Sequence, residues 1–270
     1  CSGGPGQVRL GPRAVTGVHS RAPGPGEYPD ELEIEPLSAP VDALVRVPGS
    51  KSITNRALVC AGLATGESDL HGVLFADDTE AMLGGLHELG VGLTVDRAGS
   101  RVDVRGVAGT PPTAGAVLDA RLSGTTSRFL LPVAALGHAT VVIDGDDPLR
   151  LRPMGDLLDA LAGLGAAVDP LGSPGHLPVR LGADGLSGGQ VVLRGDVSSQ
   201  FLSGLLLAAP CMVDGLRVGL EGPLVSVPYV RMTLTVMAEF GARWRWDDDV
   251  ISVEPGGYRS VDRYVIEPDA

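Results

Sequence analysis

The sequence predicts an α/β fold made of three copies of one strand–helix–strand–helix–strand–strand unit, each about 75 residues long. Two signals repeat along the 270 residues at almost the same interval. Glycines that end predicted helices recur 75 and 76 positions apart, at Gly90, Gly165 and Gly241. Helix starts rich in hydroxyl side chains recur 73 and 74 positions apart. Equal units with amphipathic helices bury their apolar faces by packing around a common centre, so we expect one domain with these helix starts at one end.

The first unit begins with residues 48–56, a stretch that contains Lys51. A short β-like run at residues 43–47 precedes it, and a helix-like apolar run follows it. Lys51 is the only lysine among 21 basic residues. Ser50 or Ser52 is expected to cap the helix, and the free backbone N–H groups and the helix dipole make an anion site there. Because lysine and arginine are not interchangeable at such a site, we predict that Lys51 faces a phosphate or carboxylate; the alternative is a solvated lysine in a turn.

The second and third units repeat this hydroxyl-rich start. Residues 123–128 and residues 198–200 each precede a helix-like apolar run. Each unit then continues with a second helix, a glycine in the position of a left-handed C-cap, and a hairpin. These second helices are predicted at residues 77–89, 156–164 and 228–240, and the hairpin strands near residues 91, 101–105, 167, 177–181, 243–246 and 250–253. Asp77 and Glu80 have the spacing of a capping box.

The composition indicates a globular chain with an aliphatic core and an acidic surface. Apolar residues make up 44% of the chain and aromatic residues only 4%, with a mean hydropathy of +0.20. The net charge of −12 argues against a nucleic-acid partner, because phosphate backbones bind basic surfaces. No run of 18 uncharged apolar residues indicates a membrane span. Cys1, Cys60 and Cys211 lack metal-ligand spacing and are expected to be thiols in the reducing cytoplasm; neither a metal nor a cofactor is expected.

The ends of the chain suggest a piece of a longer protein. Residues 1–30 are rich in glycine, proline and arginine without periodicity, and we expect a disordered tail there.

Residues 48–56, Pro-Gly-Ser-Lys-Ser-Ile-Thr-Asn-Arg, resemble the signature of the EPSP synthase (3-phosphoshikimate 1-carboxyvinyltransferase) family. Five further stretches resemble motifs of that family in the same order: Asp77-Asp78, Gly124-Thr125 with Arg128, and residues 150–153, 198–201 and 224–229. The resemblance covers residues 31–270 and implies an enolpyruvate-transferase-type, inside-out α/β domain of three βαβαββ units. By the same resemblance, residues 48–258 are the three-repeat, substrate-binding domain, residues 31–47 form strands that link to a missing second domain, and residues 259–270 form a crossover strand into it. Strands near residues 32–36 and 262–266 would belong to that second domain. The resemblance also implies transfer of the enolpyruvyl group of phosphoenolpyruvate to the 5-hydroxyl of shikimate 3-phosphate, with release of phosphate.

The same resemblance implies which residues bind the two substrates. Lys51 would contact both and stabilise an anionic, tetrahedral species, which makes it the candidate catalytic residue. The other substrate-binding candidates are Ser52, Arg56, Gly124, Thr125, Arg152, Ser198, Ser199, Gln200, Ser226 and Tyr229. The serines are as readily explained as helix caps, and capping and phosphate binding use the same free N–H groups. Arg150 is expected to be solvated. Arg128 either supports the second substrate site or, as is more common for an arginine on a helix, extends toward solvent.

Several features leave other functions open. Val227 stands where the family often has lysine, and Leu122 where asparagine is common. The family's main proton-transfer carboxylates lie in its second domain, so this chain alone is expected to be inactive. One alternative is the related transferase that acts on UDP-N-acetylglucosamine, although it has Lys-Asn in place of Lys51-Ser52 and a cysteine in the loop corresponding to residues 146–152. The other alternative is a non-catalytic phosphate-binding fragment.

Overall fold

The computed structural model describes residue 40 and residues 47–112, 115–196 and 198–268. The chain divides into two units, residues 1–45 and 46–270, and every helix and strand of the described residues belongs to the second unit. The predicted tail at residues 1–30, the strand expected at residues 32–36 and nearly all of the strand expected at residues 43–47 lie outside the described residues.

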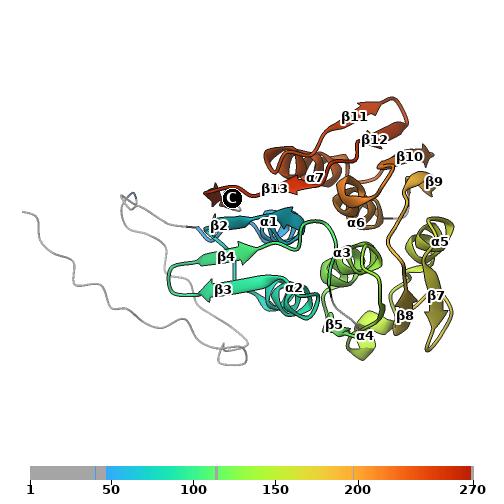
Figure 1. Ribbon diagram of the computed structural model, residues 1–270, viewed down its shortest axis with the longest axis horizontal. Coiled ribbons are helices and arrows are strands. Elements are labelled where there is room, and N and C mark those ends of the chain that lie inside the picture. Colours follow the sequence, from blue (N-terminus) through green and yellow to red (C-terminus); the bar gives the residue numbers. More distant parts are fainter. Residues whose placement is uncertain (1–39, 41–46, 113–114, 197, 269–270) are drawn as a thin grey trace, which may run out of the picture. The chain divides into compact units, whose positions relative to one another are not determined.

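Three four-stranded sheets make up most of the strands in the described part (Figure 1). The first sheet has the order β14 (Tyr264–Val265), β2 (Glu67–His71), β4 (Arg101–Arg105) and β3 (Gly92–Asp96). The second has the order β5 (Val117–Asp119), β6 (Thr140–Asp144), β8 (Val179–Gly182) and β7 (Ala167–Pro170). The third has the order β9 (Gly189–Arg194), β10 (Leu216–Glu221), β12 (Val250–Val253) and β11 (Trp244–Asp247). In each sheet the first two strands are parallel and the others are antiparallel, so the three sheets share one topology.

Six helices of nine or more residues accompany these sheets in the described part. They are α1 (Lys51–Leu63), α2 (Asp77–Glu88), α3 (Gly124–Ala135), α5 (Gly155–Gly163), α6 (Ser199–Ala208) and α7 (Val227–Glu239). All six were predicted, although α1, α3 and α6 begin earlier than their apolar runs because the hydroxyl-rich stretches are themselves helical. The single turn α4 (Asp147–Arg150), the 3-10 turn η1 (Ala209–Cys211) and the short pair β1 (Ala64–Thr65) with β13 (Tyr258–Arg259) were not predicted. The fold class and its βαβαββ repeat are confirmed.

The first sheet is completed by a strand from the far end of the chain. In the second and third sheets, the first strand belongs to the same unit as the other three. In the first sheet that place is taken by β14, which pairs parallel with β2 through Leu70 opposite Tyr264. Ser50 N donates to Glu267 O over 2.8 Å just beyond this strand. The run near residues 262–266, expected to lead into another domain, therefore also contributes to this one.

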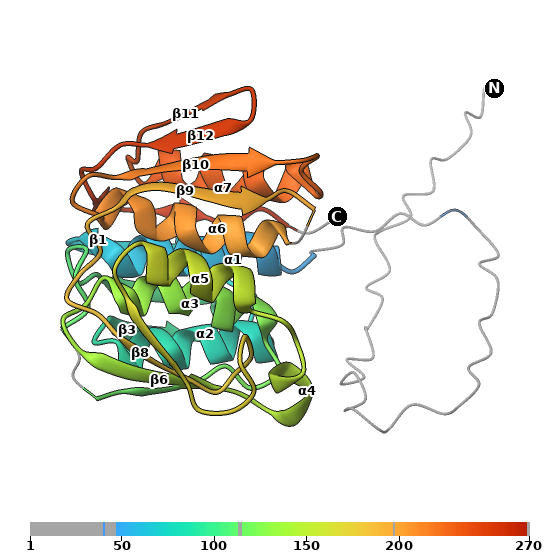
Figure 2. The same cartoon turned by 90° about the vertical axis from the view of Figure 1, so that its right-hand side faces the viewer.

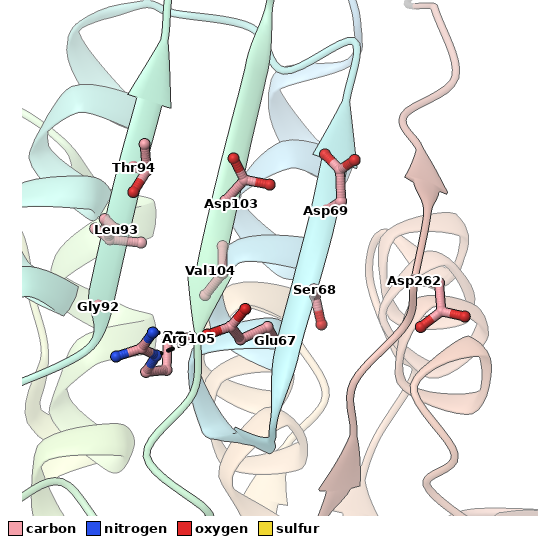
Figure 3. A pocket seen from close by; sticks show the side chains of 10 residues that line it. All are labelled: Glu67, Ser68, Asp69, Gly92, Leu93, Thr94, Asp103, Val104, Arg105 and Asp262. Atoms are coloured by element: carbon pink, nitrogen blue, oxygen red, sulfur yellow. Dashed lines mark hydrogen bonds and ion pairs between the residues drawn. The ribbon is translucent and has the colours of Figure 1, made fainter.

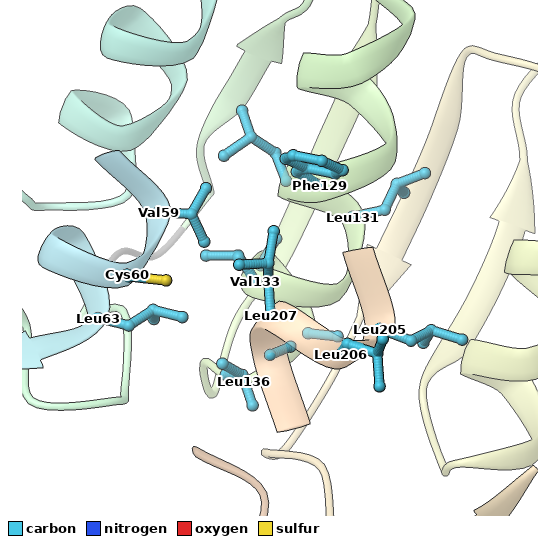
Figure 4. Packing of buried hydrophobic residues seen from close by; sticks show 14 of the residues in the cluster. Val59, Cys60, Leu63, Phe129, Leu131, Val133, Leu136, Leu205, Leu206 and Leu207 are labelled. Atoms are coloured by element: carbon cyan, nitrogen blue, oxygen red, sulfur yellow. The ribbon is translucent and has the colours of Figure 1, made fainter. Parts of the chain in front are cut away.

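The core lies between the helices and is aliphatic, as the composition predicts. Figure 2 shows α1, α3 and α6 side by side, and Figure 4 shows side chains of the three helices converging. Cys60 and Leu63 of α1, Val133 of α3 and Leu206 of α6 are each at most 1% exposed. Because α1 is buried from Thr54 to Leu63, its N-terminal end is the part that remains accessible.

The three repeated glycines have the predicted role. Gly90, Gly165 and Gly241 follow α2, α5 and α7 with φ of 88°, 104° and 88°. In each case the next residue donates its N–H to a carbonyl five positions earlier, as Val91 does to Leu86 over 3.0 Å. This is the Schellman arrangement, and it turns each helix into the hairpin that follows.

Two of the predicted helix caps are wrong. Ser50 is the N-cap residue of α1, but neither its side chain nor that of Ser52 makes the capping hydrogen bond. At α2 the N-cap is Ala76, and the hydroxyl of Thr79 accepts from its N–H over 2.8 Å. Glu80 instead forms an ion pair with Arg97. The predicted box fails because Asp77 is already the first residue of the helix, so the cap position falls one residue before the Asp-x-x-Glu spacing requires.

Candidate functional site

A pocket of about 410 Å³ lies where four helices begin. Residues from the starts of α1, α3, α6 and α7 line it: Lys51, Ser52, Arg56, Thr125, Ser198, Ser199, Gln200, Val225, Ser226 and Tyr229. Every predicted site residue except Gly124 and Arg152 is in this lining. Free N–H groups and the positive ends of helix dipoles meet here, so the position favours an anion.

The turn before α1 needs a glycine. A Cβ on Gly49 would lie 1.9 Å from the carbonyl oxygen of Gly72, so no other residue fits without moving the backbone. The chain is also held at Ser50, whose N–H binds Glu267 O. These contacts fix the place at which Lys51 begins the helix.

Lys51 points toward α2. Its Nζ lies 2.6 Å from Asp78 Oδ2, and its side chain is 48% exposed. The ammonium is therefore held by a carboxylate at one side and open to the pocket at the other. The sequence analysis missed Asp78 as a site residue, although it belongs to the quoted Asp77-Asp78 motif.

Arg56 is a buried cation. It is 2% exposed, and its guanidinium stacks 5.2 Å from the centre of the Phe129 ring. Its Nε donates to Thr233 Oγ1 over 2.7 Å and its Nη1 to Ser52 O over 2.9 Å. Burial lowers the pKa of Arg56 to about 10, so the group stays charged at neutral pH. No carboxylate among the described residues forms an ion pair with it.

Arg128 and Gln200 connect two of the helix starts. Arg128 Nη1 donates to Gln200 Oε1, and Gln200 Nε2 donates to Thr125 Oγ1 over 3.0 Å. The Arg128 guanidinium stacks on the Phe201 ring, and its Nε is buried without a partner in the described part. Burial, helped by the nearby charge of Arg152, lowers the pKa of Arg128. The expectation that Arg128 extends into solvent is therefore wrong.

Gly124 and Arg152 lie beside the pocket rather than in its lining. A Cβ on Gly124 would stand 2.9 Å from Arg152 Nη1 and 3.3 Å from Arg128 Nη1, so both guanidinium groups lie close to the backbone at this helix start. Arg152 is exposed and forms no ion pair with a described carboxylate. Arg150, by contrast, binds Asp144 and Asp147 at the surface, as expected of a solvated neighbour.

The serines that precede α6 and α7 differ, because only the first of them caps its helix. Ser198 is the N-cap of α6 and accepts from Gln200 N over 3.3 Å, so its capping role is confirmed. Ser226 precedes α7 in the left-handed region, at φ 58° and ψ 43°, and its side chain makes no capping bond. Non-glycine residues adopt this region rarely, and such residues concentrate at functional sites. Tyr229 is 49% exposed at the rim.

A larger hollow of about 650 Å³ lies elsewhere, on the open face of the first sheet (Figure 3). Its charged side chains are Glu67, Asp69, Asp103, Arg105 and Asp262, so the lining is acidic overall and does not favour an anion. Arg105 lies 2.8 Å from Glu67, and Arg101, beside it, binds Asp69. Its size alone therefore does not make it the better candidate. Within the described ranges, no cluster of three His, Cys, Asp or Glu could hold a metal, and no helix is long and apolar enough to cross a membrane.

Known proteins share this sequence and fold. The family model described as EPSP synthase (3-phosphoshikimate 1-carboxyvinyltransferase) matches residues 37–270. Proteins named 3-phosphoshikimate 1-carboxyvinyltransferase from Nostoc punctiforme and Shewanella denitrificans are 39% and 38% identical to it, over 89% of this chain. This chain spans 57% and 56% of their lengths.

Solved structures agree. An EPSP synthase structure from Acinetobacter baumannii superposes with a TM-score of 0.73 at 27% identity, covering 83% of this chain and 49% of that one. The sheets and helices of this chain thus have the inside-out α/β architecture of enolpyruvyl transferases. Sequence and fold together place this chain in the EPSP synthase family.

Proposed function

We propose that this chain binds shikimate 3-phosphate and phosphoenolpyruvate in the pocket at the helix starts and takes part in enolpyruvyl transfer between them. The products are 5-enolpyruvylshikimate 3-phosphate and phosphate, a step of the shikimate pathway toward aromatic amino acids. Both substrates are anions, and the pocket offers cations, hydroxyls and helix N-termini to receive them. The family to which the chain belongs supports the same reaction.

The observation that carries the proposal is the unpaired charge of Arg56. A buried cation without a carboxylate is costly to the fold unless an anion joins it. The described part supplies Arg56 with hydroxyl and carbonyl oxygens only. An anionic ligand is the partner that would complete this arrangement.

Each candidate residue has a role in this proposal. Lys51, held by Asp78, stabilises the negative charge that develops on the transferred group. Arg56 and Ser52 bind shikimate 3-phosphate, and Tyr229 packs against it. The hydroxyls at the starts of α6 and α7 and the amide of Gln200 receive its phosphate. Gly124, Thr125 and Arg152 bind phosphoenolpyruvate, where a planar fork of donors suits a carboxylate or phosphate.

The proposal includes a second domain as the partner of this one. The chain spans about half the length of the relatives it matches, and the pocket is open on one side. A second domain of the same enzyme would exclude water and supply further acid–base groups. The free thiols Cys60 and Cys211 support a cytoplasmic location, where disulfides are rare.

Calorimetry on the 270-residue chain tests the binding part. We expect weak, saturable binding of shikimate 3-phosphate and no detectable binding of shikimate, which lacks the phosphate. Arg56→Met should abolish the signal, whereas Arg105→Met, on the open sheet face, should not. Equal binding to wild type and Arg56→Met would contradict the proposal.

A phosphate-release assay tests the catalytic part. The 270-residue chain should release no phosphate above background from the two substrates together, and the same chain extended to the length of its relatives should turn over. Steady turnover by the 270-residue chain would show that a second domain is not needed.

A further inference from the structure

The hydroxyl of Thr233 lies behind the pocket and holds Arg56 from a helix distant in sequence. Thr233 belongs to α7 and is fully buried, with 0% exposure. Its Oγ1 accepts from Arg56 Nε over 2.7 Å, a contact between residues 177 positions apart. Thr233 is out of reach of solvent, and its hydroxyl gives Arg56 Nε the acceptor that water would otherwise supply.

The hydroxyl of Thr233 has partners for all of its hydrogen-bonding capacity. A hydroxyl has one hydrogen and two lone pairs. Arg56 Nε occupies one lone pair, since an arginine nitrogen only donates. Ser203 Oγ of α6 and Tyr229 O, one turn earlier in α7, both lie 2.9 Å from Oγ1. The group is thereby locked between three helices and cannot rotate away from Arg56.

The contacts of Arg56 determine which of its N–H groups remain to bind a ligand. A guanidinium has five N–H groups in a fixed plane. Nε binds Thr233, Nη1 binds Ser52 O, and Nη2 makes a long contact of 3.4 Å with Tyr229 O. Stacking on Phe129 fixes the plane itself. With each nitrogen bonded once, one N–H on each terminal nitrogen has no partner among the described residues, and Arg56 lines the pocket.

We propose that Thr233 is a positioning residue, which orients the guanidinium of Arg56 so that its two spare N–H groups face the anionic ligand. The inference rests on the proposed function for the identity of that ligand, but not for the contact itself. Ser203 contacts Thr233 from α6; it is not in the pocket lining, and no hydrogen bond among the described residues joins it to Arg56.

The experiment compares Thr233→Val, Thr233→Ser and Ser203→Ala in the 270-residue chain. Valine keeps the shape and removes the acceptor, serine keeps the acceptor, and Ser203→Ala is the matched control that removes a neighbouring buried hydroxyl. The first measurement needs no ligand: it is the hydrogen-exchange rate of Arg56 Nε–H, assigned in ¹H–¹⁵N spectra by its loss in Arg56→Met. We expect exchange at least roughly tenfold faster in Thr233→Val and near the wild-type rate in the other two variants.

The second measurement is the affinity for shikimate 3-phosphate. Thr233→Val should weaken it roughly tenfold, the loss expected for one hydrogen bond to a charged group, and Thr233→Ser should restore it. Unchanged exchange and unchanged affinity in Thr233→Val would overturn the proposal. If wild type itself does not bind shikimate 3-phosphate, the proposed function fails, and the exchange rates alone still decide whether Thr233 holds Arg56. A variant that loses affinity only in proportion to its melting temperature, with serine no better than valine, would mark Thr233 as merely structural.

Discussion

The open face of the first sheet and the pocket at the helix starts both contain arginines, but only those of the sheet face are paired with described carboxylates. On the sheet, Arg101 lies 2.7 Å from both Asp69 and Asp103, and Arg105 lies 2.8 Å from Glu67. In the pocket and at its edge, Arg56, Arg128 and Arg152 form no ion pair with any described carboxylate. The sheet face has the larger hollow, about 650 Å³ against about 410 Å³. Arginines without a carboxylate partner therefore indicate the site better than volume does.

The physical reason is that an exposed ion pair changes the stability of the fold only slightly. A surface pair is worth about 0–1 kcal/mol, so its presence or absence hardly affects the fold. A buried cation without a counter-ion lowers stability, and such a cost persists where a ligand requires it. The comparison predicts that substitutions in the two regions affect function and stability in opposite ways.

The largest effect is expected at Lys51, the one cation of the pocket that has a carboxylate partner among the described residues. In the chain extended to the length of its relatives, Lys51→Ala should reduce turnover by roughly 10²–10³, as when one preorganised donor to a developing charge is lost. Lys51→Arg keeps the charge but displaces it, and a misplacement of about 1 Å costs on the order of a hundredfold. Turnover rate and melting temperature are measured for both variants.

The matched control for Lys51 is Arg105→Gln, which removes one cation from the paired sheet face and should leave turnover unchanged. If Lys51→Arg also retains wild-type turnover, Lys51 is a solvated residue in a turn, and the contrast between the two regions does not extend to catalysis.

An effect of intermediate size is expected at Arg56, where a substitution should lower ligand affinity without lowering stability. Arg56→Met should weaken binding of shikimate 3-phosphate at least roughly tenfold, while the melting temperature stays the same or rises, because an unpaired buried charge is replaced by an apolar side chain. Arg101→Met should do the reverse: affinity unchanged and a stability loss of about 0.2–1 kcal/mol. Calorimetry and thermal melts measure both quantities, and equal destabilisation by the two substitutions would remove the distinction.

The smallest effect concerns pH and an ion pair outside both regions, between Glu80 of α2 and Arg97. The hydrogen bonds from Arg97 lower the pKa of Glu80 below its usual value of 4.5. A lowered folded-state pKa adds stability above the unfolded value, and that stability is lost as the pH falls through the folded value. Wild type should therefore exceed Glu80→Gln by less than about 1 kcal/mol at pH 7, and by nothing at a pH below the folded value. Denaturant melts at both pH values check this, and a constant difference would argue against the ion pair as the cause.

The repeat was readable in the sequence because local rules produce it. Gly90 marks a helix end since its positive φ suits glycine, and the same rule holds at the two later repeats. The hydroxyl-rich helix starts predicted that Ser52, Thr125 and Ser198 would lie together, and they line one pocket. Their binding roles remain predictions.

What the sequence did not reveal depends on contacts between distant segments. Asp78 contacts Lys51 only because α1 and α2 lie side by side, and Thr233 contacts Arg56 although the two are 177 positions apart in sequence. Arg128 looked like a surface residue because nothing near it in sequence shows that Gln200 and Phe201 would cover it. The failed cap at Asp77 depended on a one-residue shift in the helix start, and sequence patterns locate helix boundaries only to within a few residues.

The pairing of β14 with β2 has a consequence for the order in which the domain is completed during synthesis. The second and third sheets draw all their strands from single contiguous stretches, so each can close as soon as it has left the ribosome. The first sheet lacks its β14 strand until Val265 emerges from the ribosome, after every other strand in the described part has been synthesised. The strand pairs that span the greatest sequence separation also close most slowly. The unit that is synthesised first, and that presents Lys51, is therefore the last to be finished.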